Sequence, residues 1–140
     1  MNSENFQRLI DLLEEDRFGY CQQYYVHRSC GTPACIAGHA TWLYCKEDKE
    51  AYGLCGSQDM VFEARKFLGI SPEVAISRLF SPNPLLDVLV EREESHLDRD
   101  TIKKRYGREN FKPTVEDAVK VLKHLEATGE VDWGVCLEIT

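Results

Sequence analysis

The sequence predicts a mainly α-helical protein: one compact domain spanning residues 1–140, built as a bundle of five or six helices with little or no sheet. Apolar residues recur at helical spacing in several segments, and Gly- or Pro-containing stops separate those segments. The 140 residues are enough for one domain with its own core. Hydrophobic residues make up 43% and charged residues 29%, which is ordinary globular composition. Collagen-like and disordered classes are therefore excluded.

The bundle is expected to surround a buried central helix at about 33–45. Its start signal is strong: Gly31 supplies a turn, Thr32 is the expected N-cap, and Pro33 is the expected first helical residue, where a missing N–H costs nothing. Apolar residues then cover nearly every face, which is typical of a buried helix. One stripe is small enough for a neighbouring backbone to approach closely: Ala34, Ala37, Gly38 and Thr41.

Further helices are expected at about 4–15, at 57–68 with Gly69 as the stop, after Ser71, and from Thr114 to Gly129. Thr114 and Asp117 have the spacing of a capping box. The N-caps expected for the first two of these helices are Ser3 and Ser57. The tail from Val131 has the alternation of a strand, and the aromatic run at 17–28 is expected to be extended or a loop packed on the core.

Residues 84–112 are expected to form a charged insertion or surface segment. The apolar run at 85–90 predicts the start of a helix. Six acidic and six basic residues follow within 91–109, a balance typical of a solvated helix or a surface loop.

The net charge and the absence of sorting signals limit which classes of partner and which cellular compartment we expect. The net charge of −7 argues against a phosphate-binding surface, so we expect no nucleic-acid partner. No apolar run approaches the roughly 18 residues that span a bilayer, so no membrane partner is expected. The N-terminus is acidic and amphipathic, unlike a secretory signal. We therefore expect a cytoplasmic protein whose six cysteines are mostly free and buried.

Most of the chemical information lies between His27 and His39, and three interpretations compete there. The first is a zinc site formed by His27, Cys30, Cys35 and His39, which offer two imidazoles and two thiols. Cys35 and His39 are four residues apart on one helix face, so both can reach one ion. Zinc is therefore the only cofactor that the sequence suggests.

The second interpretation is a thiol-dependent enzyme with Cys35 as nucleophile and His39 as its nearby base. Cys35 is expected in the first turn of the helix, where unpaired N–H groups and the macrodipole favour a thiolate. The third interpretation is structural, and it is the one we favour. In it, the cysteines pack as small apolar groups around a helix start formed by a six-residue motif: Cys30, Gly31, Thr32, Pro33, Cys35 and Gly38.

Four segments carry a resemblance to a known family: CGTPACIAGHA, ARKFLGI, SRLF and TVEDAVKVLKHLEATGEVDW. The chain resembles a family of small uncharacterised bacterial and phage proteins with the helix-start motif C-G-T-x-x-C-x-x-G-x-A. In that family, tryptophan often occupies the position of His39, so the resemblance does not support this residue as a zinc ligand or an obligate base. The resemblance implies a fold and no mechanism.

The sequence therefore predicts a small cytosolic binding or accessory protein, without catalytic activity, whose partner is another protein. An exposed groove or the charged segment at 85–110 is the expected contact surface. The thiol-dependent enzyme and the structural zinc site remain as alternatives, and the sequence gives no oligomeric state.

Overall fold

The computed structural model describes residues 1–27, 31–55, 57–72, 79–108 and 110–137. Within these ranges, the only β-structure is an isolated bridge between Val26 and Pro33, so the mainly helical prediction is confirmed. The helix expected after Ser71 falls largely outside the described residues. The helices are α1 (Ser3–Glu15), α2 (Ile36–Tyr44), α3 (Lys49–Gly53), α4 (Ser57–Leu68), α6 (Pro84–Glu91), α7 (Arg99–Tyr106), α8 (Val115–Thr128) and the 3-10 helix η2 (Trp133–Leu137).

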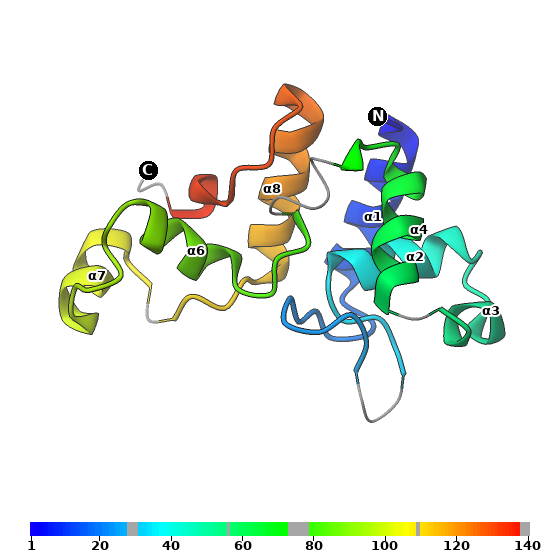
Figure 1. Ribbon diagram of the computed structural model, residues 1–140, viewed down its shortest axis with the longest axis horizontal. Coiled ribbons are helices and arrows are strands. Elements are labelled where there is room, and N and C mark those ends of the chain that lie inside the picture. The colour runs from blue at the N-terminus through cyan, green and yellow to red at the C-terminus, as the bar shows by residue number, and fades with distance from the viewer. Residues whose placement is uncertain (28–30, 56, 73–78, 109, 138–140) are drawn as a thin grey trace.

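Helix α8 lies in the middle of the molecule, between one group of helices that contains α1, α2 and α4 and another that contains α6 and α7 (Figure 1). On one side, α1 packs against α8 and α2, and α2 packs extensively against α4. On the other side, η2 packs against both α8 and α6, and α7 lies at the far end. No described helix has both the length and the apolar character needed to cross a bilayer.

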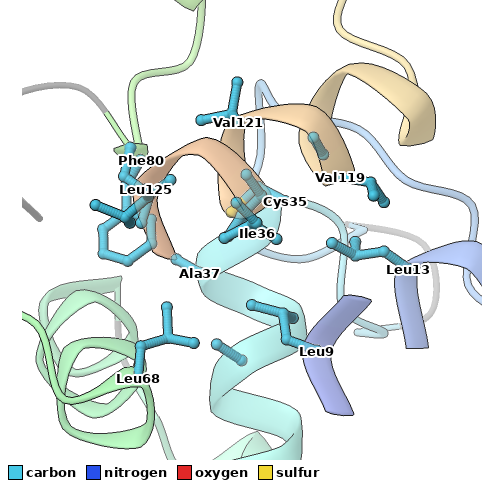
Figure 2. Close-up of a cluster of buried hydrophobic side chains, with 14 of the residues drawn as sticks. Leu9, Leu13, Cys35, Ile36, Ala37, Leu68, Phe80, Val119, Val121 and Leu125 are labelled. Atoms are coloured by element: carbon cyan, nitrogen blue, oxygen red, sulfur yellow. The ribbon is translucent and has the colours of Figure 1, made fainter. Parts of the chain in front are cut away.

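Helix α2 is the buried element at the centre of the core. All its residues are buried except Trp42 and Tyr44. Figure 2 shows Cys35 and Ile36 at its start, beneath α8. Leu9 and Leu68 approach its sides from α1 and α4, respectively.

The predicted start of this helix is wrong by three residues. Its N-cap is Cys35, whose Sγ accepts a hydrogen bond from the Gly38 N–H at 3.4 Å. Thr32 is not the cap and Pro33 is not helical, because residues 32–34 are paired with residues 25–27. The His27 N–H donates to the Thr32 carbonyl at 2.8 Å, and the Ala34 N–H donates to the Tyr25 carbonyl at 3.0 Å. This pairing holds 32–34 extended, and Gly31 forms the turn with φ +67°.

The ends of the other helices follow their local chemistry. Thr114 and Asp117 form the predicted capping box of α8, and Gly129 ends that helix in the left-handed conformation. Helix α1 is capped by Asn2 rather than Ser3, since the Asn2 carboxamide oxygen accepts from the Asn5 N–H at 3.0 Å.

The tail is helical, not extended as its alternation predicts. The Asp132 carboxylate accepts a hydrogen bond from the Gly134 N–H at 2.8 Å, a local contact that competes with strand formation. The chain then forms η2, which buries Trp133 and Leu137.

Candidate functional site

The structure describes three of the four proposed zinc ligands; Cys30 lies outside the described residues. The His27 Nε2 lies 2.6 Å from the Gly19 carbonyl oxygen, and the His39 Nδ1 lies 2.8 Å from the Cys35 carbonyl oxygen. A carbonyl only accepts, so each of these ring nitrogens carries a proton. In the part of the chain that the structure describes, no three His, Cys, Asp or Glu side chains are arranged to hold a metal ion.

Cys35 is buried, and its surroundings favour the neutral thiol. Burial raises its pKa to about 11, although the hydrogen bond from the Gly38 N–H acts in the opposite direction. His39 bonds to the backbone carbonyl of Cys35, not to its sulfur. The structure therefore places Cys35 at the N-cap of α2 and His39 within that helix, and it joins them through the Cys35 carbonyl.

The His39 ring is fully buried. Its ring centroid lies 6.0 Å from that of Phe18 and 6.4 Å from that of Tyr20. Burial lowers the pKa of His39 to about 4, and the hydrogen bond to Cys35 opposes that shift. The Nε2 atom has no hydrogen-bond partner among the described residues. His39 is therefore an uncharged core residue at neutral pH.

Gly38 is the point where the backbone of Tyr25 lies against α2. A Cβ at this position would lie 2.1 Å from the Tyr25 carbonyl oxygen and 3.2 Å from the Tyr52 hydroxyl. Real Cβ atoms do not approach a backbone oxygen so closely. At Gly38, the small-residue stripe predicted from the sequence therefore allows the backbone of Tyr25 to approach α2 closely.

Gln22, which the sequence analysis did not single out, joins this segment to the rest of the molecule. Its side-chain nitrogen donates to the Leu79 and Ser81 carbonyls at 3.1 and 3.0 Å. Its oxygen accepts from the Tyr20 hydroxyl at 2.7 Å and from the Ile36 N–H at 3.4 Å. A single glutamine in an aromatic run gives no periodic signal, so only the structure reveals this role.

A groove of about 650 Å³ lies between α6, α7 and residues 108 and 110–112, and we call it the α6–α7 groove. Its volume is within the range of ligand-binding clefts. Its lining residues are apolar (Leu86, Leu89, Val90, Leu97, Ile102, Phe111), uncharged polar (Gln23, Asn83, Ser95, Asn110) and cationic (Arg99, Arg108, Lys112). None of the described residues that line it is acidic.

Polar contacts hold the α7 wall of the groove, because α7 itself has no buried residue. Glu94, near the end of α6, accepts hydrogen bonds from Tyr106 and Arg105. These two bonds hold the pKa of Glu94 below its usual range. Arg92 adds a bond to the Tyr106 hydroxyl at 3.2 Å, and the Tyr106 ring meets Phe111 edge to face at 6.3 Å.

The opposite wall is fastened to α8 through Arg108. Its guanidinium pairs with the Asp117 carboxylate at 2.9 Å and donates to the backbone carbonyls of Asn110 and Lys112. Its charge is therefore already compensated. By contrast, the side chains of Arg99 and Lys112 form no ion pair with any described residue.

Exposed apolar side chains lie along the α6 side of this groove. Leu86 is 48% exposed and Val90 is 61% exposed, whereas Leu85, Val88 and Leu89 of the same helix are buried. The sequence contains the signal for this, since the run LLDVLV places apolar residues all round a short helix. Apolar side chains that gather on the surface in a groove are typical of an interaction site.

Comparisons of the chain with protein-family models, with curated proteins and with solved structures found no significant match.

Proposed function

We propose that this chain is a cytoplasmic, non-catalytic binding protein, and that its α6–α7 groove holds an acidic, amphipathic segment of another protein. The observation that supports this proposal is the composition of the groove. Apolar side chains such as Leu86 and Ile102 lie beside the cations Arg99 and Lys112, and no described lining residue is acidic.

Charge complementarity selects this occupant. The chain has a net charge of −7, whereas the charged residues among the described lining of the groove are all cations, so the groove is locally opposite in sign to the whole molecule. A segment with aspartate or glutamate beside leucine, isoleucine or phenylalanine would pair with Arg99 and Lys112 while its apolar side chains cover Leu86 and Val90. Two cations without an ion pair among the described residues are too few for a nucleic-acid surface, and the exposed leucine and valine give a phosphate backbone nothing to contact.

The alternatives based on Cys35 have less support. A thiol-dependent reaction needs an accessible thiolate, whereas Cys35 is buried and has a pKa raised to about 11. A zinc site from His27, Cys30, Cys35 and His39 would require new side-chain positions, since both described imidazoles already donate to backbone carbonyls.

Selection from a random peptide display library on the purified full-length chain tests the proposed function. We expect the enriched peptides to combine apolar residues with aspartate or glutamate. The double variant Arg99→Glu, Lys112→Glu should bind these peptides with an affinity about tenfold lower, or lower still. A selection on this variant should enrich peptides that contain lysine or arginine instead. Lys123→Glu, on the exposed face of α8, is the matched control and should keep the original selection.

The apolar half of the groove has its own pair of variants. Leu86→Ser should weaken a selected peptide by about tenfold or more, because it removes an apolar contact. Leu54→Ser changes a more exposed leucine, 86% accessible and outside the groove, and should leave the affinity unchanged. Enrichment of basic peptides by the natural chain, or capture of single-stranded DNA in competition, would contradict the proposal. Concentration-dependent self-association blocked by Leu86→Ser would identify a second copy of the chain as the occupant instead.

A further inference from the structure

A second pair of cysteines, separate from the Cys30–Cys35 motif, lies at the ends of two helices: Cys45 at the end of α2 and Cys55 just after α3. The Sγ atoms of Cys45 and Cys55 are 4.0 Å apart, and both residues are partly exposed. The sequence does not single out this pair, because ten positions and a short polar connector separate the two residues.

Both sulfurs are positioned by hydrogen-bonded backbone. Cys45 is the C-cap of α2, and its N–H donates to the Thr41 carbonyl at 2.9 Å. The Cys55 N–H donates to the Tyr52 carbonyl at 3.1 Å, just after α3. The ring of Tyr52 in turn meets Trp42 of α2 edge to face at 5.4 Å. The two helices therefore hold the thiols close together in the folded state.

We propose that Cys45 and Cys55 form a reversible dithiol–disulfide pair, oxidised by a low-molecular-weight disulfide of the glutathione type. Bonded sulfurs lie about 2.05 Å apart, so the thiols, now 4.0 Å apart, need to approach by about 2 Å, and the proposal requires their side chains to rotate by that amount. The bond would join the end of α2 to the end of α3 and close a ring around α3.

The reaction takes place in two exchanges. One protein thiolate attacks a sulfur of the small disulfide, forms a mixed disulfide and releases one small thiolate, which takes up a proton. The second protein thiol then loses its proton and attacks the sulfur of the mixed disulfide that belongs to the protein, releasing the second small thiol. Two electrons pass from the cysteine pair to the small disulfide, which is reduced to two thiols.

The surroundings of Cys45 make this exchange dependent on pH. Burial, the neighbouring Cys55 and the carboxylates of Glu63 and Asp48 raise the pKa of Cys45 to about 11. Little thiolate is present there at neutral pH, so the exchange should be slow near pH 7 and faster as the pH rises toward 9.

Thiol counting by intact mass tests the proposal on the full chain. The folded protein is incubated with oxidised glutathione, quenched with an alkylating agent and weighed. We expect the natural chain to lose two thiols without keeping glutathione, and dithiothreitol to restore both. Cys45→Ser and Cys55→Ser should instead keep a glutathione mixed disulfide on the remaining cysteine. Cys136→Ser is the control, because it removes a partly buried cysteine whose thiol donates a hydrogen bond to the Asp117 carbonyl. This variant should lose two thiols without keeping glutathione, as the natural chain does.

Peptide mapping of the oxidised natural chain locates the bond without any variant. Trypsin cuts after Lys46 and Lys49, so a Cys45–Cys55 bond joins two tryptic peptides. Because Cys30 and Cys35 share the first of these peptides, a further cut by chymotrypsin after Tyr44 separates Cys45 from them. A bond to Cys55 from Cys30 or Cys35 would overturn the proposal, as would stable glutathione adducts on Cys45 or Cys55 of the natural chain, or no loss of thiols at pH 9. None of these results bears on peptide binding by the α6–α7 groove.

Discussion

Replacing the buried His39 with asparagine should change how the stability of the protein depends on pH. The pKa of a histidine in an unfolded chain is about 6.5, and burial lowers the pKa of His39 to about 4 in the folded protein. Above pH 6.5 both states hold a neutral ring, and the free energy of unfolding does not depend on this residue's protonation. Between pH 6.5 and about 4 the unfolded chain binds a proton that the folded protein does not, so the free energy of unfolding falls as the pH falls.

The size of this loss follows from the shift. A difference of about 2.5 pKa units at about 1.36 kcal/mol each gives roughly 3 kcal/mol, lost between pH 6.5 and 4. Carboxylates also titrate in this range; Glu94, for instance, has a pKa held low by Tyr106 and Arg105. The comparison therefore has to be between the natural chain and a variant. His39→Asn keeps a side-chain donor near the Cys35 carbonyl but does not titrate.

Urea unfolding at half-unit steps from pH 7.5 to 4 measures the effect. We expect the natural chain to lose about 3 kcal/mol more than His39→Asn over this range. His96→Asn, at an exposed histidine outside the core, is the matched control. Parallel curves for the natural chain and His39→Asn would refute the reasoning, because they would mean that the His39 ring protonates equally well in both states.

Three further substitutions or treatments have definite expected outcomes. Gly38→Ala should destabilise the fold by about 3 kcal/mol or more in thermal unfolding, because the added Cβ would lie 2.1 Å from the Tyr25 carbonyl oxygen. In the control Gly53→Ala, the added Cβ meets nothing within 4 Å, so this variant should be neutral or slightly more stable. Asp117→Ala should cost about 2–4 kcal/mol in urea unfolding, because it removes half of the α8 capping box and leaves Arg108 without its carboxylate; no loss would mean that neither contact matters. Iodoacetamide at pH 7 should modify Cys35 far more slowly in the folded protein than in urea, and equal rates would restore the thiol-dependent interpretation.

Periodicity and stop signals predicted the helical core because they report on local geometry. The amphipathic pattern of α1 and α8, the capping box at Thr114 and the stop at Gly129 all need only neighbouring residues to be read. Burial of α2 was also predictable, since an all-round apolar helix has few other stable positions.

Features set by individual hydrogen bonds outside the helices were not predictable in this way. The start of α2 moved from Pro33 to Ile36 because residues 25–27 pair with 32–34 and keep them extended. The tail became η2 because no neighbouring strand is present among the described residues and Asp132 favours a turn. The hydrophobic pattern alone gives neither the pairing of 25–27 with 32–34 nor the Asp132 turn.

Only part of the α6–α7 groove could be predicted from the sequence. A surface role for the charged segment was expected, but the balance of its charges conceals their arrangement. In three dimensions, Glu94 and Asp117 neutralise Arg105 and Arg108, while Arg99 is left at the groove without an ion pair among the described residues. The same composition spread evenly over a helix would have given no site.

Methyl-group NMR of the natural chain, titrated with an acidic apolar peptide from the display selection, tests the binding role of the groove most directly. The account predicts that the methyl signals of Leu86, Val90 and Ile102 shift with a single saturable affinity, that added salt weakens this affinity, and that the signals of Leu54 stay in place. Shifts confined to residues around Cys35 and Ile36, with the groove signals unchanged, would contradict it.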